Sequence, residues 1–323
     1  MYDVVALGEL LIDFTPAGIS QLGNAMFERN PGGAPANVLS AVSKLGGKGA
    51  FIGKVGNDQF GIFLKNVLEE HDIETKGLKF SKEVNTTLAF VHLDERGDRS
   101  FSFYRKPGAD MMLSSDDLDL DMIDEAKIFH FGSLSMTNEP SKSATKTALE
   151  YARRKGKIIT YDPNWRPALW DNDEAAKEGM IFGLQFADIL KISEEELEFL
   201  SGTKDVHDGS KRLFDMGIKI VIVTLGSKGC FYNCLAGSGY LNTYDTKVVD
   251  TTGAGDSFLG ALIYQISKYV GEIETIKLDE LKAMIDFSNA VGALCASKKG
   301  AINAMPAIEE VRHCMENIPL LKV

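Results

Sequence analysis

The segment VVDTTGAGDSFLGAL, residues 248–262, combines two acids with a glycine-rich turn. The spacing of apolar residues after the turn predicts an amphipathic helix. Gly253 and Gly255 permit positive φ angles and close approach of the backbone to a ligand. The amides of Ala254, Gly255 and Asp256 would then point outward at the start of that helix, where an anion is favoured. The turn therefore predicts a preorganised site for a phosphate or another oxyanion.

The two acids of this segment leave two interpretations open. Asp256 is either a helix cap, since acids are common at helix N-termini, or a carboxylate that meets a reacting group. Asp250 is either an acid that ends a strand or a ligand for a cation. The turn alone does not decide between these interpretations.

Two common nucleotide-binding motifs do not fit the chain. A Walker A loop requires G-x-x-x-x-G-K-[ST], but GKGAFIGKV, residues 47–55, has the wrong glycine spacing and ends in Val55. A dinucleotide fingerprint requires G-x-G-x-x-G after a first strand, whereas GAGDSF has Phe258 at the third glycine position. A nicotinamide-dependent dehydrogenase is therefore disfavoured.

Composition and charge exclude several classes of partner. The net charge of -11 argues against nucleic acid or an anionic membrane surface. No apolar run approaches the roughly 20 residues of a membrane span, and the N-terminus lacks the features of a signal peptide. The four cysteines form no C-x-x-C pair and no cluster with the five histidines, which predicts reduced thiols and no zinc site. We expect a cytoplasmic protein without a nucleic-acid or membrane partner.

Apolar strands alternate with amphipathic helices along most of the chain, which predicts an α/β fold. The strands are expected at 4–10, 49–56, 127–132, 157–162, 188–192 and 218–226, with helices between them and three helices after residue 250. This alternation indicates a mostly parallel sheet with helices on both faces, and ligands at the carboxyl ends of its strands. Residues 86–93 and 99–105 instead alternate at period two around the turn DERGD, which predicts a β-hairpin. That hairpin is either a plain edge hairpin or a lid, together with residues 14–30.

Long blocks of the chain resemble the ribokinase-like (PfkB) carbohydrate kinases. GGAPANVLSAVSKLGGKGAFIGKVGNDQFG and DTTGAGDSFLGAL are similar to the two signature blocks of that family. The blocks between them resemble its fructokinase branch: GELLIDFTP, FERNPGGAPAN, SFSFYRKPGADMML, YDPNWRPALW, ILKISEEELEFL and KKGAINAMP. The resemblance implies one domain over residues 1–323, a three-layer α/β sandwich with a β lid formed by about residues 14–30 and 86–105. It also implies a homodimer as a common assembly.

The resemblance assigns roles to particular residues of the sugar and phosphate site. Asp256 matches the base that takes the proton of the sugar hydroxyl, and the helix N-terminus is expected to keep its carboxyl ionised. Gly253, Ala254 and Gly255 match the anion hole for the transferred phosphoryl group. The residues matched to sugar or phosphate binding are Asp13, Gly32, Gly33, Asn37, Arg105 and Arg166.

Further matches concern the nucleotide and the metal ions. The residues matched to nucleotide binding are Lys191, Ser193, Thr224, Gly226, Gly229 and Asn289. Ser193 departs from the asparagine of the wider family, while Glu196 matches a residue that holds Mg²⁺ through water. Asp250, Thr252, Gly300 and Ala304 match a K⁺ site that would fix the anion-hole turn.

The sequence thus predicts a kinase that uses ATP and Mg²⁺, with K⁺ as a further cofactor, and a hexose as its substrate. We expect fructokinase, which makes fructose 6-phosphate. The first alternative is 2-keto-3-deoxygluconate kinase, whose substrate carboxylate would use Arg105 or Arg166. The second is a sugar-sensing module without catalysis, for which Asp256 would have no use.

Overall fold

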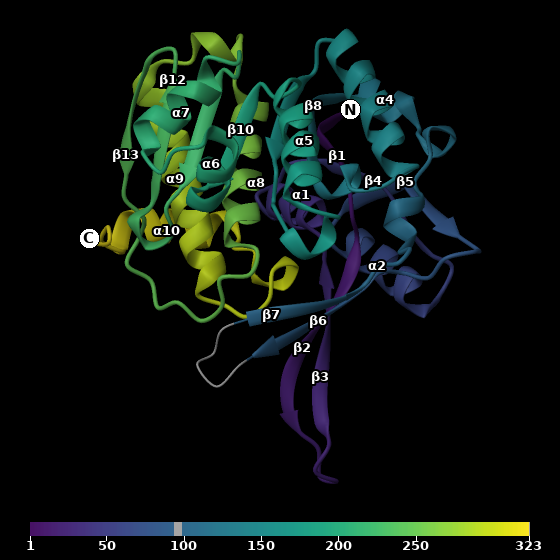
Figure 1. The fold of residues 1–323 in the computed structure, drawn as a ribbon. Coiled ribbons are helices and arrows are strands. Elements are labelled where there is room, and N and C mark those ends of the chain that lie inside the picture. The colour runs from purple at the N-terminus through teal and green to yellow at the C-terminus, as the bar shows by residue number, and fades with distance from the viewer. Residues whose placement is uncertain (94–98, 323) are drawn as a thin grey trace.

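The structure is a computed structural model that describes residues 1–93 and 99–322 of the chain. The turn DERGD, residues 94–98, lies outside the described residues. Two sheets organise the described part (Figure 1). No helix in the described ranges is both long and apolar enough to cross a membrane.

The large sheet has nine strands in the order β13-β12-β11-β10-β9-β8-β1-β4-β5. Its pairs are parallel from β5 to β11, and β12 and β13 are antiparallel. The strands are β1 Tyr2–Leu7, β4 Gly49–Gly56, β5 Ile73–Ser81, β8 Ala126–Gly132, β9 Ile158–Asp162, β10 Ile189–Ser193, β11 Ile220–Thr224, β12 Cys230–Cys234 and β13 Gly237–Leu241. The predicted mostly parallel sheet is confirmed, while β5, β12 and β13 lie outside the six strand ranges given above.

Helices cover both faces of this sheet because its central strands are apolar on both sides. In β1, Val4 and Ala6 pack into one hydrophobic core, and Val5 and Leu7 pack into the other. The first core is closed by α1 Ala34–Lys44, α2 Gln59–Glu70, α8 Ala254–Lys268 and α9 Leu278–Ala296. The second is closed by α3 Leu120–Asp124, α4 Ser141–Arg154, α5 Asp173–Leu184, α6 Glu194–Ser201 and α7 Val206–Phe214. The last helix, α10 Ile308–Asn317, packs on α9.

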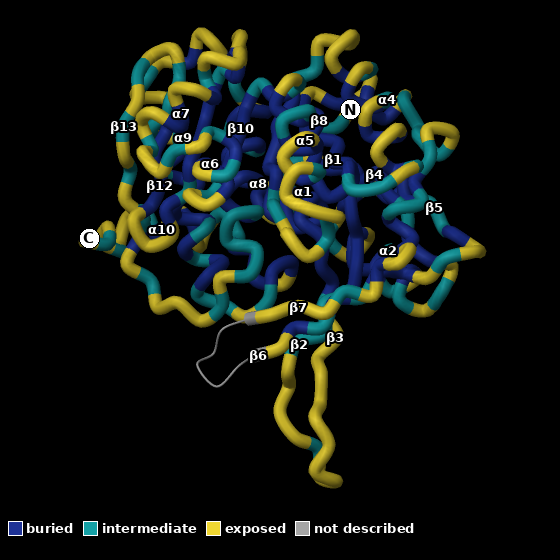
Figure 2. Tube along the Cα trace, viewed as in Figure 1, coloured by how far each residue is buried: buried dark blue, intermediate teal, exposed yellow. Residues whose placement is uncertain are grey.

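The small sheet has four strands in the order β3-β2-β6-β7. They are β2 Leu11–Ile19, β3 Ala25–Gly32, β6 Leu88–Leu93 and β7 Arg99–Tyr104. The pairs β2–β3 and β6–β7 are antiparallel hairpins, and β2 joins them by parallel pairing with β6. The β2–β3 hairpin projects from the body, and its outer part is exposed along its length (Figures 1 and 2).

Candidate active site

A polar cavity of about 370 Å³ lies at the carboxyl ends of the central strands. It contains most of the residues predicted to bind the sugar and the transferred phosphate. The predicted residues that line it are Asp13, Gly33, Asn37, Arg166, Lys191, Ser193, Glu196, Thr252, Gly253, Gly255 and Asp256. The topology thus brings residues from both halves of the chain to one edge of the sheet, as expected for an open α/β sheet.

Asp256 is the third residue of α8, and its half-buried carboxyl accepts a hydrogen bond from Asn37 Nδ2 at 2.8 Å. It makes no capping hydrogen bond at the start of α8, so the capping interpretation does not hold in the structure. Desolvation raises the pKa of Asp256, as does Asp162, whereas Lys191, the Asn37 hydrogen bond and Arg166 lower it. The net direction is upward, against the sequence-based expectation of a carboxyl held ionised by the helix. A carboxyl with a raised pKa is a stronger base.

Gly253 precedes α8 in the anion-hole turn, and its φ of 75° is in the left-handed region. A Cβ at this position would also lie 2.6 Å from the Ala301 Cβ, so only glycine fits. The amide of Ala254 donates to the Thr251 carbonyl at 3.2 Å, which differs from its predicted role as a free donor. Among the described residues, the amides of Gly255 and Asp256 have no such partner. These two amides are the donors available to an anion at the N-terminus of α8.

Lys191 brings a buried positive charge to the same turn. Its Nζ lies 2.8 Å from Asp162 Oδ2, and it would lie 2.9 Å from a Cβ on Gly255. Burial alone would lower the pKa of Lys191, but the carboxylates of Asp162, Glu196 and Asp256 raise it. Lys191 is therefore a cation at the anion-hole turn. It lines the polar cavity. It does not line the second cavity, described below, which contains most of the residues predicted to bind nucleotide.

Glu196 and Ser193 form a capping box at the start of α6. Ser193 Oγ accepts from the Glu196 amide at 3.2 Å, and Glu196 Oε2 accepts from the Ser193 amide at 2.8 Å. Glu196 Oε1 accepts from the Trp165 amide at 2.7 Å. Burial raises the pKa of Glu196, Asp162 raises it further, and Lys191 and the two amides lower it. The backbone thus fixes the carboxylate at the cavity wall, where it keeps lone pairs for a water ligand of a cation.

Asp13 and Arg166 approach the cavity from the small sheet and from the loop after β9. Burial raises the pKa of Asp13 to about 6, with Arg166 lowering it and Asp256 raising it. Arg166 is exposed and donates to the Trp165 carbonyl at 2.9 Å. A Cβ on Gly32 would lie 2.1 Å from Asp13 Oδ2, so this glycine leaves room for the carboxyl.

Arg105 lies apart from this group. Its Nε contacts Asp110 Oδ2 at 2.7 Å, and its two terminal nitrogens donate to Thr137 Oγ1 and to the Leu134 carbonyl at 3.0 and 2.9 Å. Arg105 is 5% exposed and is not among the residues that line the cavity. Asp110 and the 134–137 segment accept hydrogen bonds from Arg105, and the contact of Arg105 with sugar or phosphate stays a prediction.

A second cavity of about 340 Å³ adjoins the turn on its other side. Thr224, Gly226, Gly229 and Asn289, all predicted to bind nucleotide, line it. Asn289 is buried and donates to the Asn242 carbonyl at 3.2 Å, so its side chain also holds the irregular segment that follows β13. Ala254 lines this second cavity, Asp256 lines only the polar cavity, and Gly255 lines both. Gly255 and Thr251, which line both cavities, therefore lie at the boundary between them.

The predicted cation segment lies behind the turn. Asp250 Oδ1 accepts from the Thr252 amide and hydroxyl at 2.9 and 2.7 Å, and Oδ2 accepts from the Gly300 amide at 3.1 Å. A carboxylate with nearby backbone carbonyls is the oxygen-rich donor set that suits a hard cation. Ala304 is fully buried and does not line the adjoining cavity, unlike Asp250, Thr252 and Gly300.

Two buried acids of the site are absent from the sequence-based predictions. Asp162 ends β9 and pairs with Lys191. Glu9 follows β1, lines the polar cavity, and accepts from the Ala34 amide at 3.0 Å through Oε1, while its Oε2 is buried without a partner. Both follow strands of the parallel sheet, so their position at the carboxyl ends of strands was a usable signal.

Comparisons with known sequences agree with this geometry. The pattern of the pfkB family carbohydrate kinases matches residues 1–308. A probable fructokinase-2 of Arabidopsis thaliana is 45% identical over 306 residues, which are 94% of this chain and 92% of that protein. Fructokinase-2 of Solanum lycopersicum is 45% identical over 312 residues, which are 95% and 94% of the two chains.

Solved structures give the same result for the fold. A fructokinase from Xylella fastidiosa with bound ATP has a TM-score of 0.91 at 32% identity, covering 98% of this chain and 99% of that one. A double mutant of a Vibrio cholerae fructokinase, in a form bound to fructose, ADP and potassium ion, has a TM-score of 0.88 at 33% identity, covering 97% and 98%. With the family pattern over nearly its whole length and relatives at 45% identity, the chain belongs to the pfkB family of carbohydrate kinases.

Proposed function

We propose that the chain is an ATP-dependent fructokinase that transfers the γ-phosphoryl group of ATP to the 6-hydroxyl of fructose. The observation that supports this most directly is the division of the site into two cavities that share Gly255 and Thr251. The Asp256 carboxyl borders only the polar cavity, which suits a sugar, whereas Ala254 borders only the nucleotide side. The phosphoryl group would then cross between substrates at the amides of Gly255 and Asp256.

The residues present suit an in-line transfer. Asp256 takes the proton of the fructose hydroxyl, and the hydroxyl oxygen forms a bond to the γ-phosphorus. The bond from that phosphorus to the bridging oxygen breaks, and ADP leaves with the electron pair. Asn37 holds the base in place through its hydrogen bond to Oδ2. Positioning of this kind supplies much of the catalysis in phosphoryl transfer.

The charge that develops on the transferred group meets fixed donors. The amides of Gly255 and Asp256 stand at the positive end of α8, and Lys191 lies beside Gly255. Arg166 adds an exposed guanidinium at the cavity wall. Glu196 would hold a water of the Mg²⁺ ion that accompanies ATP, and that ion would supply positive charge to the ATP phosphates. K⁺ at the Asp250–Thr252 segment would hold the turn in shape.

A neutral sugar fits the cavity better than 2-keto-3-deoxygluconate. Arg105, one of the two arginines that a substrate carboxylate would need, is ion-paired with Asp110. The cavity is lined by the acids Glu9, Asp13, Glu195, Glu196 and Asp256. The ionised acids among them repel a substrate carboxylate, whereas sugar hydroxyls donate hydrogen bonds to carboxyl oxygens. A sensing module without catalysis is also disfavoured, because such a protein has no need for a base held by Asn37.

The four-stranded sheet is the proposed lid of this site. Phe101 and Phe103 on β7 line the polar cavity, so the sheet can cover a bound sugar and exclude water.

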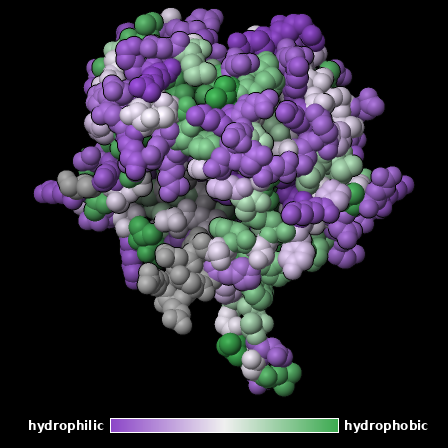
Figure 3. Space-filling view, viewed as in Figure 1, coloured by the Kyte–Doolittle hydropathy of each residue, from purple (hydrophilic) through white to green (hydrophobic). Residues whose placement is uncertain are grey.

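We also propose a homodimer through the β2–β3 hairpin, since Ile19, Leu22 and Phe27 are exposed there and hydrophobic residues gather on the projection (Figure 3). Light scattering with a Phe27→Glu variant tests this. A monomeric wild type excludes the dimer.

A cytoplasmic location stays a prediction. It is supported by the composition of the chain. One relative, 42% identical, is named as a probable chloroplastic fructokinase-6. Fractionation of cells that express the tagged chain tests the location.

The deciding experiment measures ADP release from ATP with a panel of sugars, with K⁺ and without it. We expect turnover on fructose and none on 2-keto-3-deoxygluconate. Asp256→Asn should still bind fructose but lose roughly 10²–10⁴-fold in turnover, the range for a general base. Near-normal turnover in that variant would refute the role of Asp256. Sugar binding by the wild type without ADP release on any sugar would refute the kinase and favour the sensor.

A further inference from the structure

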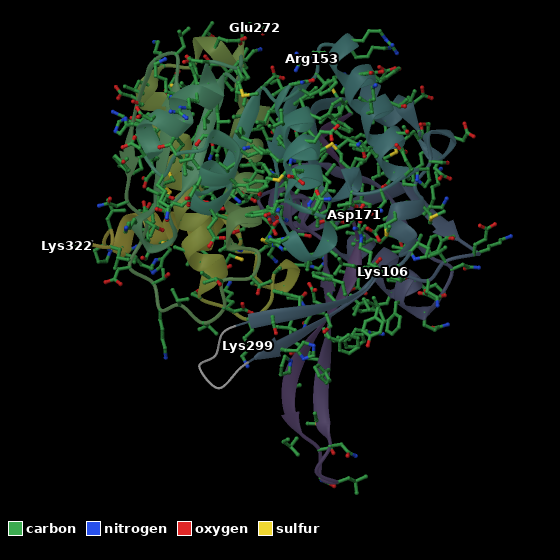
Figure 4. The ribbon with its side chains drawn as sticks, in the orientation of Figure 1. Lys106, Arg153, Asp171, Glu272, Lys299 and Lys322 are labelled. Atoms are coloured by element: carbon green, nitrogen blue, oxygen red, sulfur yellow. The ribbon has the colours of Figure 1, made fainter. Side chains whose placement is uncertain are left out.

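The small sheet is joined to the body by four chain crossings. They are residues 8–10 between β1 and β2, residue 33 between β3 and α1, residues 82–87 between β5 and β6, and residues 105–108 between β7 and the 3-10 turn Ala109–Met112. Lys106, labelled in Figure 4, lies at the junction of the sheet and the body. Any change in the position of the sheet over the cavity must pass through these segments.

Asp110 binds both ends of the β6–β7 hairpin at this junction. Its Oδ1 accepts from the hydroxyl of Thr87, the residue before β6, at 2.5 Å. Its Oδ2 accepts from Nε of Arg105, the residue after β7, at 2.7 Å. Asp110 is 6% exposed, so water competes little for these contacts. Gly108 allows the close packing, because a Cβ there would lie 1.8 Å from Thr87 Oγ1.

Arg105 continues this contact into the body. Its other nitrogens donate to the Leu134 carbonyl and to Thr137 Oγ1 in the segment after β8. Leu134 lines the polar cavity, and so do Phe101 and Phe103 of β7. The contacts from Asp110 through Arg105 therefore connect the Leu134 segment to β7, and both line the polar cavity.

We propose that Asp110 is a positioning residue for sugar binding, which fixes the β6–β7 hairpin at both ends and, through Arg105, sets its place over the cavity. This inference rests on the proposed function. Asp110 does not touch the substrate in this role. Loss of the Asp110 carboxylate changes the fit of the sugar. The nucleotide cavity is left unchanged, because it contains no residue of this network.

The test is Asp110→Asn, which removes the charge and keeps the size of the side chain. We expect the KM for fructose to rise at least ten-fold, while the KM for ATP stays within two-fold. The control is Asp117→Asn. This variant breaks the Lys54–Asp117 ion pair at 2.8 Å, which joins no strand of the small sheet. It should lower the melting temperature without a change in either KM.

A second pair of variants covers the case in which Asp110→Asn fails to fold. Thr87→Val removes only the hydroxyl contact, so the KM for fructose should rise about three-fold or more, and Thr87→Ser should restore it. An unchanged KM for fructose in Asp110→Asn or Thr87→Val, with lowered thermal stability, would show a purely structural role and overturn the proposal. Failure of the proposed function is distinguishable, because the wild type would then not turn over fructose at all.

Discussion

Glu9 gives a quantitative prediction about the stability of this fold. The carboxyl is 4% exposed, and one of its oxygens has no partner. Burial raises its pKa from the ordinary value of 4.5 to about 7. The amides of Glu9 and Ala34 lower the pKa, Asp110 raises it, and Arg105 lowers it. The folded protein therefore binds a proton here at pH values where the unfolded chain has released it.

The sign and size of the effect follow from linkage. A group with a raised pKa in the folded state stabilises the protein at low pH, and this stabilisation is lost as the pH rises through the folded value. Between pH 5 and pH 8 the two pKa values of Glu9 give a loss of about 2.5 kcal/mol. Glu9→Gln cannot titrate and keeps an oxygen for the Ala34 amide. Its free energy of unfolding, relative to wild type, should rise by this amount over the same pH interval.

The assay is urea unfolding of wild type and Glu9→Gln at pH 5, 6, 7 and 8. Comparison of the two proteins cancels the titration of other groups such as Asp13. The control is Glu195→Gln, which removes an exposed acid that borders the same cavity and accounts for the loss of one carboxylate. Parallel stability curves for wild type and Glu9→Gln would refute the reasoning, since burial would then not hold the proton on Glu9.

Three further predictions concern the site. Gly32→Ala should raise the KM for fructose at least ten-fold in steady-state assays, because its Cβ would lie 2.1 Å from Asp13 Oδ2 and displace that carboxyl. Lys191→Met should lower turnover and, by leaving the buried Asp162 carboxylate unpaired, cost about 3–5 kcal/mol of stability in chemical denaturation. Replacing K⁺ with tetramethylammonium should lower turnover of the wild type, and a smaller response to K⁺ is expected for Asp250→Ala. An unchanged rate in each case would contradict the corresponding assignment.

The sequence allowed the fold and the outline of the site to be predicted, because both depend on patterns local to short segments. The buried strands β1 and β11 are continuous apolar runs, and α8 has a clear apolar stripe after a glycine turn. The strand β5 was not predicted, because its sequence IETKGLKFS is poor in apolar residues and the alternation of buried and exposed residues stops after five positions. Its place is set by pairing with β4, which lies outside the segment itself.

Contacts between side chains that are distant in the chain could not be predicted from the sequence. Arg105 stands in a block typical of sugar binding, yet its three contacts go to residues 5, 29 and 32 positions away. Lys191 was assigned to the nucleotide, but its pairing with Asp162 turns it toward the polar cavity. The upward direction of the Asp256 pKa likewise depends on desolvation and on Asp162, neither of which a motif contains.

The hydrogen bond between Asn37 and Asp256 joins residues that are 219 positions apart in the chain. Loop-closure entropy grows slowly with length, so this separation costs little at equilibrium, but contacts at long range form late in folding. The strands and helices around each residue can form before the two meet. Catalytic activity in a refolding experiment should therefore return after the far-ultraviolet circular dichroism, as a reporter of the moment at which the two halves of the molecule dock.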